Sequence, residues 1–521
     1  MSTKKRDSWG SAIGVILAVT GSAVGLGNFL RFPGLAAKYD GGAFLIPYFL
    51  ALFFLGLPIA WSEWTMGRMG GQHGFNSCPG IFRSLWKNRL APYLGVLGLI
   101  VPVIIYMYYL WIESWCLGYA WKYLTGQMNL GVEPATYTAH FTSFVGITAD
   151  GSFFSHGLSL PITSLLFCIV LNFFFIYRGL SGGIEKVCLW GMPLLILCAL
   201  IVLVRVLTLG TPDPTHPERN VLTGLAYMWD FRGGLAGLFH SLQNAEMWMA
   251  AAAQIFFSLS IGFGVIINYS SYLKKKDDIA LSSTTAVAGN EFCEVSLGGL
   301  ITIPAAFIFL GVAGTAGGTF GLGFQTLPVV FAHMPAGQLF GFLWFFLLLI
   351  AALTSSLSML QPVIAFMEEG LDLDRRGSVS LLGFITLIGT GLVVWFTHDL
   401  AALEAMDFWV GSFCIFLLAT VQTIIYGWVI GTRKGRQELE SGALLPIPQV
   451  YDFIIRYISP IYLITVFAIW MHQKGADSLT AIRSHPSVQI TLLFIVAVIL
   501  LFLLLIGRAV RVWNAKEKSR S

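Results

Sequence analysis

Residues 20–28, Thr-Gly-Ser-Ala-Val-Gly-Leu-Gly-Asn, place three glycines beside small hydroxyl and amide side chains within an apolar segment. Each glycine is unfavourable inside a helix by roughly 1 kcal/mol relative to alanine, so we expect the helix to open here. An opened helix within a bilayer is tolerated only where protein buries the backbone or where the backbone lines a wet cavity. The freed amides and carbonyls can then act as ligands, and the stretch is predicted to be a binding site.

A second interruption of similar composition lies at Phe257-Ser-Leu-Ser-Ile-Gly-Phe-Gly264. Its Gly262-Phe-Gly264 repeats the pattern of Gly25-Leu-Gly27. Glycine is common in membrane helices, so one such pair would be explained by composition alone. Two matched breaks, each flanked by hydroxyl or amide side chains, are typical of secondary transporters built from two inverted repeats with a site at the midplane.

The composition indicates which elements position these breaks. Of the 521 residues, 56% are hydrophobic and 11% are charged, whereas a soluble domain has roughly 25% charged residues. The chain is therefore predicted to be an all-α polytopic membrane protein of about twelve transmembrane helices, since each span needs roughly 20 apolar residues. The apolar segments lie near 9–38, 42–69, 91–124, 160–177, 187–209, 246–270, 280–312, 337–367, 379–397, 405–430, 451–471 and 487–507.

The breaks fall in the first and sixth segments, which divides the chain into repeats. We expect a first inverted repeat over 1–209, a second over 210–430 and two additional C-terminal helices over 431–521. Lysine and arginine gather near both ends and in loops on one side of this arrangement, and the positive-inside rule makes that side cytoplasmic. Both termini are thus predicted to be cytoplasmic, in a cell inner membrane. Residues 313–336 are predicted to form an outer loop that packs back on the protein.

Other functional classes receive less support. The nine histidines form neither His-x-x-x-His nor His-Glu-x-x-His, which argues against an intramembrane metalloenzyme. The seven cysteines lie singly, without disulfide or metal-site spacing. The net charge of +4 arises from short loops and chain ends and does not indicate nucleic-acid binding. A cation channel or a substrate sensor with the same architecture stays open, because binding residues alone do not show turnover.

Four stretches are specific enough to compare with a known family. They are Gly21-Ser-Ala-Val-Gly-Leu-Gly-Asn-Phe-Leu-Arg-Phe-Pro33, Tyr108-Tyr109 with Glu113-Ser-Trp115, Gln254-Ile-Phe-Phe-Ser-Leu-Ser-Ile-Gly-Phe-Gly264 and Thr354-Ser-Ser356. Together they resemble the neurotransmitter:sodium symporter family, and most closely its bacterial leucine-transporter-like branch. The resemblance extends over nearly the whole chain. It implies a 5+5 inverted repeat with broken first and sixth helices, and sodium-coupled symport by alternating access.

The resemblance further implies two Na⁺ sites made of neutral oxygen ligands, which suit a hard monovalent cation. The first would use the Ala23 carbonyl, the side-chain oxygens of Asn28, Ser258 and Asn290, and a carboxylate oxygen of the substrate. The second would use the carbonyls of Gly21, Val24 and Ala351 with the hydroxyls of Thr354 and Ser355. Ser258 stands where relatives have threonine and keeps the hydroxyl. For the hydroxyls of the second site, ordinary bonding to the preceding helical turn is the alternative.

The resemblance also implies the class of substrate. Its carboxylate would meet the amides of Leu26 and Gly27 at the positive end of a half-helix, with the Tyr109 hydroxyl as another donor. Monoamine-carrying members have an aspartate where this chain has Gly25, so a neutral, hydrophobic amino acid is favoured here. Another small carboxylate-bearing solute is the alternative. The implied pocket residues, for which bundle packing is the alternative role, are Ala23, Ile105, Phe257, Ser260, Phe263, Ser355, Ser356 and Met359.

Charged residues are implied to gate the two ends of the site. Arg31 and Asp407 would form an outer gate pair above Tyr109 and Phe257. At the inner end, Arg6 and Trp9 resemble a latch whose acidic partner is usually an aspartate. In this chain that position is Glu369.

Glu294 is one helical turn beyond Asn290, where chloride-dependent relatives have a small hydroxyl residue. Intramembrane carboxylates are costly and usually functional, and this one would supply the negative charge that chloride supplies elsewhere. We therefore expect two Na⁺ ions and no chloride requirement, with proton counter-transport left open. The expected partners are a neutral amino acid and the lipid bilayer but no nucleic acid, and a homodimer is left open.

Overall fold

The computed structural model describes residues 8–155, 157–315, 318–444 and 446–518. Over these residues the chain is helical, and the only β pairing is an isolated bridge between Gly41 and Phe231. The label α marks an α-helix, and η marks a short 3₁₀- or π-helical segment.

The helices follow one another along the chain in three groups. The first group is α1 (Ala12–Ala23), η1 (Gly27–Arg31), α2 (Phe32–Lys38), α3 (Gly42–Ala51), η2 (Leu52–Gly56), α4 (Leu57–Gln72), α5 (Cys78–Leu85), α6 (Ala91–Leu94), α7 (Leu97–Leu124), α8 (Pro134–Val145), η3 (Ser152–Phe154), α9 (Leu160–Tyr177), η4 (Leu180–Ile184) and α10 (Glu185–Leu207). The second group is α11 (Val221–Trp229), α12 (Gly234–Leu242), α13 (Ala245–Leu259), α14 (Val265–Ser270), α15 (Ile279–Glu291), η5 (Phe292–Gly299), α16 (Leu300–Gly314), α17 (Gly318–Gly321), η6 (Leu322–Thr326), α18 (Leu327–His333), α19 (Gly337–Gly370) and α20 (Arg375–Trp395). The third group is η7 (His398–Leu400), α21 (Ala401–Met406), η8 (Asp407–Cys414), α22 (Ile415–Ile424), η9 (Ile425–Gly431), α23 (Thr432–Leu439), α24 (Val450–Phe453), η10 (Ile454–Ile458), α25 (Ser459–Ser484) and α26 (Pro486–Lys518).

The spans agree closely with the apolar segments of the sequence. Among the described residues, ten continuous helices are long and apolar enough to cross a membrane. The pair Ala12–Ala23 and Gly27–Lys38, bent by 47°, raises the number to eleven. The predicted sixth segment is divided into α13, of 15 residues, and the short α14. The predicted all-α membrane fold with a broken first and sixth helix is therefore confirmed.

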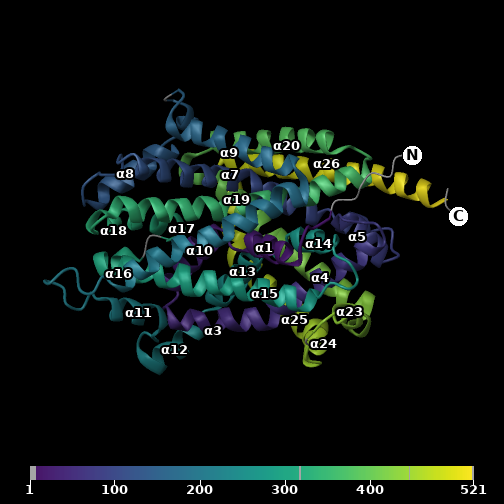
Figure 1. The fold of residues 1–521 in the computed structure, drawn as a ribbon, viewed down its shortest axis with the longest axis horizontal. Coiled ribbons are helices and arrows are strands. Elements are labelled where there is room, and N and C mark those ends of the chain that lie inside the picture. Colours follow the sequence, from purple (N-terminus) through teal and green to yellow (C-terminus); the bar gives the residue numbers. More distant parts are fainter. Residues whose placement is uncertain (1–7, 156, 316–317, 445, 519–521) are drawn as a thin grey trace.

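The helices lie side by side along the long axis of the molecule (Figure 1). Both ends of the described chain lie at one end of this bundle, together with α5 and α23, whereas α8, α11, α12 and α18 lie at the opposite end (Figure 1). The short helices α1, α13 and α14 lie near the middle (Figure 1). The two breaks are thus held midway along the bundle.

Helix α7 forms much of the scaffold around the breaks. Its most apolar, membrane-spanning part is entirely buried, as expected of a helix that is apolar on all sides. It packs against α9, α19 and α20, and α19 in turn packs against α1 and α10. Helix α1, which ends at the first break, therefore packs against α19, and α19 packs against α7.

Within the predicted loop 313–336, residues 318–333 form α17, η6 and α18 and fold back on the bundle. The rings of Phe320 and Phe324 lie 5.5 and 5.7 Å from that of Trp115 on α7, both edge-on. Aromatic pairs prefer this geometry. The predicted packing of this loop is therefore confirmed.

Arg68 joins three segments at the end of the bundle that carries the chain ends. Its side chain is fully buried, and Nε donates to the Glu438 carboxylate at 2.7 Å. One terminal nitrogen donates to the carbonyls of Lys275, Asp277 and Ser441. The arginine therefore connects α4 to α23 and to the loop that follows α14.

Replacing this arginine is expected to destabilise the fold. Removing one partner of a buried ion pair costs about 3–5 kcal/mol, because the remaining polar groups lose their donors. Arg68→Ala should therefore lower the thermal unfolding midpoint of the purified protein markedly. The matched control is Arg433→Ala, because Arg433 is an exposed residue of α23 and surface substitutions stay within about 0.5 kcal/mol. Equal melting curves for both variants would contradict this role.

Candidate binding site at two broken helices

The first break lies between α1 and η1. Helix α1 ends at Ala23, and Val24 has an extended backbone with φ −74° and ψ 92°. The side-chain oxygen of Asn28 accepts the Gly25 N–H at 2.9 Å, replacing a partner that the helix no longer supplies. The chain resumes as a helix at Gly27. The opening predicted from the glycines is therefore confirmed.

The second break lies between α13 and α14. Ser260, Gly262 and Gly264 all have positive φ angles, of 54°, 73° and 82°. A Cβ on Gly264 would lie 2.4 Å from the carbonyl oxygen of Gly98, so only glycine fits there. The hydroxyl of Ser260 donates to the Ser22 carbonyl at 2.9 Å. The two breaks are thus in direct contact, although they are far apart in the sequence.

The residues expected to bind the first sodium ion lie close together. One end of the Asn290 amide lies 3.3 Å from the Ala23 carbonyl oxygen and 3.2 Å from that of Ser258. With its nitrogen at that end the amide donates to both carbonyls, and with its oxygen there three neutral oxygens face one another, a set that suits a hard cation. The Ser258 oxygen in this set is its carbonyl, whereas the predicted hydroxyl donates to Glu294. Asn28 differs from the expectation, because its oxygen is bound to Gly25 while its Nδ2 donates to Asn290 at 2.8 Å. In this arrangement Asn28 presents nitrogen to the cluster.

Three of the five residues expected at the second sodium site, Gly21, Thr354 and Ser355, come together. The Ser355 hydroxyl donates to the Gly21 carbonyl at 3.3 Å and so reaches from α19 to α1. A Cβ on Gly21 would lie 3.3 Å from Cβ of Thr354, so the two helices are close here. The Thr354 hydroxyl donates to the Ala351 carbonyl at 3.1 Å, which is ordinary bonding to the preceding turn. Val24, the fifth member, is buried at the end of α1.

Backbone amides and one phenol lie where the substrate carboxylate is expected. The Leu26 N–H donates to the Tyr109 hydroxyl oxygen at 3.0 Å. A Cβ on Gly25 would lie 2.7 Å from that phenol oxygen and 2.9 Å from the Ser355 hydroxyl. Leu26 and Gly27 begin the half-helix after the break, and helix N-termini favour anions. The region around Gly25 is therefore narrow and rich in donors.

The apolar residues of the expected pocket come from three helices. The rings of Phe257, at the end of α13, and Phe263, within the second break, lie 5.8 Å apart, edge to face. Ile105 is fully buried on α7 and Met359 is nearly so on α19, and these two helices pack against each other. Phe257 also lines a cavity that opens beyond the second break.

Ser356 was expected in the pocket, but its hydroxyl is directed elsewhere. It donates to the Asn172 side-chain oxygen on α9 at 2.7 Å. The Asn172 nitrogen donates to Glu113 on α7 at 2.9 Å. Ser356 therefore belongs to a buried polar cluster that joins α7, α9 and α19.

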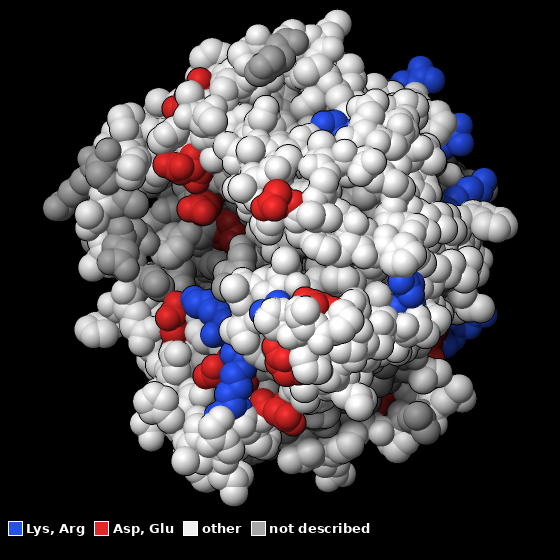
Figure 2. Space-filling view, turned by 90° about the vertical axis from the view of Figure 1, so that its left-hand side faces the viewer, with Lys and Arg blue, Asp and Glu red and all other residues white. Residues whose placement is uncertain are grey.

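The cavity encloses ≈440 Å³ and leads from the second break toward the end of the molecule opposite the chain ends. Figure 2 views this end, where the surface is hollowed and acidic side chains gather beside the hollow. The cavity is lined by Leu26, Gly27, Leu30, Arg31, Tyr108, Tyr109, Ile112, Phe257, Thr319, Phe320, Leu403, Glu404, Asp407, Phe408 and Ser412. The substrate-site residues Tyr109 and Phe257 are thus reached from this side.

The expected outer gate residues share the cavity but do not form an ion pair. Among the described residues, no ion pair within 4.0 Å joins Arg31 to Asp407. The Arg31 guanidinium lies over the Phe257 ring, 5.0 Å from its centroid. The Tyr108 hydroxyl donates to Asp407 at 2.8 Å. Each gate residue thus has its own partner.

At the inner end, the expected latch residues are engaged separately. Trp9 donates from its ring nitrogen to the Tyr269 carbonyl at 3.0 Å. Glu369 accepts the N–H of Asn76 at 2.6 Å and also binds the Ser77 hydroxyl. Arg6 lies outside the described residues, so its contact with Glu369 stays a prediction.

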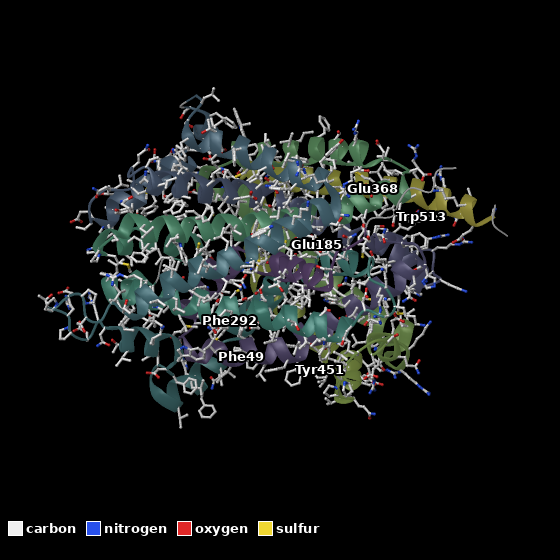
Figure 3. All side chains as sticks on the ribbon, in the orientation of Figure 1. Phe49, Glu185, Phe292, Glu368, Tyr451 and Trp513 are labelled. Atoms are coloured by element: carbon white, nitrogen blue, oxygen red, sulfur yellow. The ribbon has the colours of Figure 1, made fainter. Side chains whose placement is uncertain are left out.

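Glu185 makes a contact at the same end that the sequence patterns did not reveal. It lies beside α1 (Figure 3) and accepts the backbone N–H groups of Gly10 and Ser11 at 2.7 and 3.1 Å. A carboxylate at a helix N-terminus is stabilising, because it satisfies free N–H groups and the helix dipole. The start of the first helix is therefore fixed by a residue of α10.

Glu294 is fully buried within a ring of hydrogen-bond donors. Its carboxylate accepts from Gln254 at 2.7 Å, from Asn28 at 3.1 Å and from the Ser258 hydroxyl. Asn290 donates to it at 3.4 Å. The carboxylate therefore contacts three side chains of the expected first sodium site, and its negative charge lies beside the oxygen cluster.

Sequence reasoning missed other residues that connect the site. Ser22 and Ser358 are joined by a 2.7 Å hydrogen bond between their hydroxyls. Ser358 lies one turn after Thr354 on α19, so helical spacing offered a signal. Gln254 and Tyr108 stood inside the quoted motifs without an assigned role. Their roles became visible only through their contacts with Glu294 and Asp407.

Comparison with known proteins identifies the family of this chain. The family model described as the sodium:neurotransmitter symporter family matches residues 6–142 and 147–515. The chain belongs to this family. As a sodium:neurotransmitter symporter family member it is a sodium-dependent secondary transporter with multiple membrane spans, and it is not an enzyme.

Individual relatives of this symporter cover most of its length. It is 28% identical over 485 residues to an uncharacterized sodium-dependent transporter of Methanocaldococcus jannaschii, covering 89% of this chain and 90% of that protein. It is 28% identical to an uncharacterized sodium-dependent transporter of Bacillus subtilis, covering 90% of this chain and 98% of that protein. The crystal structure of MhsT in complex with L-phenylalanine matches with a TM-score of 0.75 at 26% identity, covering 89% and 99% of the two chains.

Proposed function

We propose that this symporter carries neutral, hydrophobic amino acids together with two Na⁺ ions and without chloride. The observation that carries the proposal is the surroundings of Gly25. Its Cα faces the Tyr109 phenol and the Ser355 hydroxyl, next to the amides that begin a half-helix. Such a set of donors suits a substrate that brings its own carboxylate. The similar MhsT structure is a complex with L-phenylalanine, which supports an amino acid as the substrate.

The cycle that we propose is alternating access. The substrate enters through the cavity lined by Arg31, Phe257 and Asp407. Arg31 and Asp407 then leave their present partners and pair above the substrate. At the other end, α1 is held by Glu185 until it releases. The cytoplasmic position of both termini and the inner-membrane location belong to this proposal, and so does the assignment of repeats to 1–209, 210–430 and 431–521.

The sodium gradient and the membrane potential can supply the free energy needed to accumulate the amino acid. One charge crossing 100 mV yields roughly 2.3 kcal/mol, so two sodium ions with a zwitterion yield roughly 4.6 kcal/mol. This corresponds to more than a thousandfold accumulation at about 1.4 kcal/mol per decade.

Uptake by the purified protein in proteoliposomes tests the proposal. Radiolabelled leucine, alanine, methionine and phenylalanine should accumulate saturably when sodium is outside and potassium inside. Equal uptake after replacement of external sodium by potassium would contradict sodium coupling. Single-channel currents without saturable uptake would favour a cation channel, which no contact of the described residues specifically supports.

The shared geometry of ion and substrate gives a sharper test. Asn28 contacts both the Gly25 amide and Asn290, so Asn28→Ala should weaken sodium and amino-acid binding together, each at least tenfold. Equilibrium binding of labelled substrate across a sodium titration measures both. Asn220→Ala is the control, because the Asn220 side chain caps α11 and binds the neighbouring Pro217 carbonyl, in an exposed loop away from both breaks. Loss of substrate affinity with an unchanged sodium dependence would contradict the shared role.

A further inference from the structure

A groove on the side of the bundle lies between α9 and α20, away from both breaks. It encloses ≈990 Å³. Gly383 on α20 packs closely against Phe173 on α9 at the floor of the groove, and a Cβ at this position would lie only 3.2 Å from the Phe173 ring. Its lining consists of Ile169, Val170, Phe173, Phe174, Tyr177, Arg178, Val379, Ser380, Gly383, Phe384 and Leu387. Apart from one arginine, these side chains carry no formal charge.

The length of the groove corresponds to one leaflet of a bilayer. Its lining runs from Ile169 on α9 to Arg178, which directly follows that helix, and this is about 14 Å at 1.5 Å per residue. The hydrocarbon core of a bilayer is about 30 Å thick, so one leaflet spans about 15 Å. A single acyl chain could therefore lie along the whole groove.

The polar lining residues gather at one end. Helices α9 and α20 are antiparallel here, and Arg375 at the start of α20 donates to the Ile176 carbonyl at 2.6 Å. Tyr177, Arg178 and Ser380 therefore lie at the same end of the groove. Near this end Glu368 is 3.7 Å from Arg375, and Figure 3 places Glu368 toward the end of the bundle where Trp513 lies.

Arg178 presents an uncompensated positive charge. The residue is exposed, and its guanidinium lies 4.2 Å from the centroid of the Phe174 ring, which is part of the groove. Within the described part of the chain, no carboxylate lies within 4.0 Å of it. Basic pockets between membrane helices on the cytoplasmic side bind anionic head groups.

We propose that this groove is a binding site for one anionic phospholipid of the leaflet on the side of the chain ends. The phosphate contacts Arg178 and the Ser380 hydroxyl, and an acyl chain lies against Phe173, Phe384 and Leu387. Arg178 directly precedes Gly179, whose φ of 82° turns the chain from α9 into η4 and α10. A bound lipid therefore stabilises the connection to the helix that holds the start of α1.

The test uses the full chain in detergent after removal of its lipids. Native mass spectrometry during titration with phosphatidylglycerol or phosphatidylcholine measures both affinities. The wild type should bind phosphatidylglycerol at least tenfold more tightly, and Arg178→Gln should abolish this preference while Arg178→Lys retains most of it. The control is Arg456→Gln, because Arg456 is also exposed and also lies over a neighbouring ring, that of Tyr457.

Several outcomes would overturn the assignment. An unchanged preference in Arg178→Gln would place the lipid elsewhere, and equal binding of both lipids by the wild type would exclude recognition of charge. Displacement of phosphatidylglycerol by equimolar inorganic phosphate would assign the site to a free anion. Efficient disulfide formation between two copies of a Val170→Cys variant in lipid vesicles would show that a second copy of this chain, and not a lipid, covers the groove.

Discussion

Glu294→Ser is expected to make transport depend on chloride. The buried carboxylate accepts hydrogen bonds from Gln254, Asn28 and the Ser258 hydroxyl, next to the expected first sodium site. Removing it leaves these donors without an anion, and leaving buried polar groups unpaired is costly. A chloride ion can accept the same donors. Sodium-driven uptake by the variant should fall at least tenfold in gluconate medium and recover in chloride.

The wild type and a neighbouring variant provide the comparison. Wild-type uptake should be equal in chloride and gluconate. Glu291→Gln removes the carboxylate three residues before Glu294, which accepts a hydrogen bond from the Tyr48 hydroxyl at 2.8 Å. This variant should not make transport respond to chloride. If Glu294→Ser transported equally well in both media, the role assigned to Glu294 would be wrong. A strong chloride requirement in the wild type would refute it as well.

Gly25→Val is expected to abolish substrate binding while leaving the protein folded. The first added carbon would lie 2.7 Å from the Tyr109 phenol oxygen and 2.9 Å from the Ser355 hydroxyl. Both distances are shorter than the van der Waals contact between a carbon and an oxygen atom. The Tyr109 hydroxyl must therefore move away from the Leu26 N–H. The branched side chain would also fill the space proposed for the amino acid. We expect a loss of at least a hundredfold in affinity for labelled substrate.

The control for this substitution is Gly391→Ala on α20, where an added carbon would meet nothing within 4 Å. Its binding and melting curves should match those of the wild type. Gly25→Val should keep a cooperative melting transition, which separates a blocked site from a misfolded protein. Unchanged amino-acid affinity in this variant would place the substrate away from Gly25 and would remove the main support for the proposed function.

Much of the architecture could be predicted from local patterns. Apolar runs of sufficient length indicate spans wherever they occur, and the ranges 91–124 and 160–177 coincide with helical spans of the structure. Glycine weakens a helix regardless of its neighbours, so both breaks were visible in the sequence. The second break was predicted at 257–264 but begins later, because α13 continues to Leu259 and the positive φ angles fall on Ser260, Gly262 and Gly264.

Side-chain partners were less predictable. Ser356 lies in the Thr354-Ser-Ser motif, yet its hydroxyl binds Asn172 rather than facing the break. Asp407 and Arg31 share a cavity but bind Tyr108 and Phe257 separately. Glu185 carried no motif at all, although it holds the start of α1. Each of these contacts depends on how one helix is rotated against another.

The sequence by itself determined that the chain crosses a membrane many times, that two of its helices open midway and that its motifs are those of a sodium symporter family. The first two properties follow from hydrophobicity and helix propensity, which act over a few turns of one segment, and the third from the resemblance of its motifs to that family. The tertiary structure alone decided which carbonyls face the Asn290 amide, which donors surround Glu294 and where Arg178 ends an apolar groove. Those arrangements arise from packing between segments that are distant in the chain, and no local pattern encodes the rotation of one helix against the next.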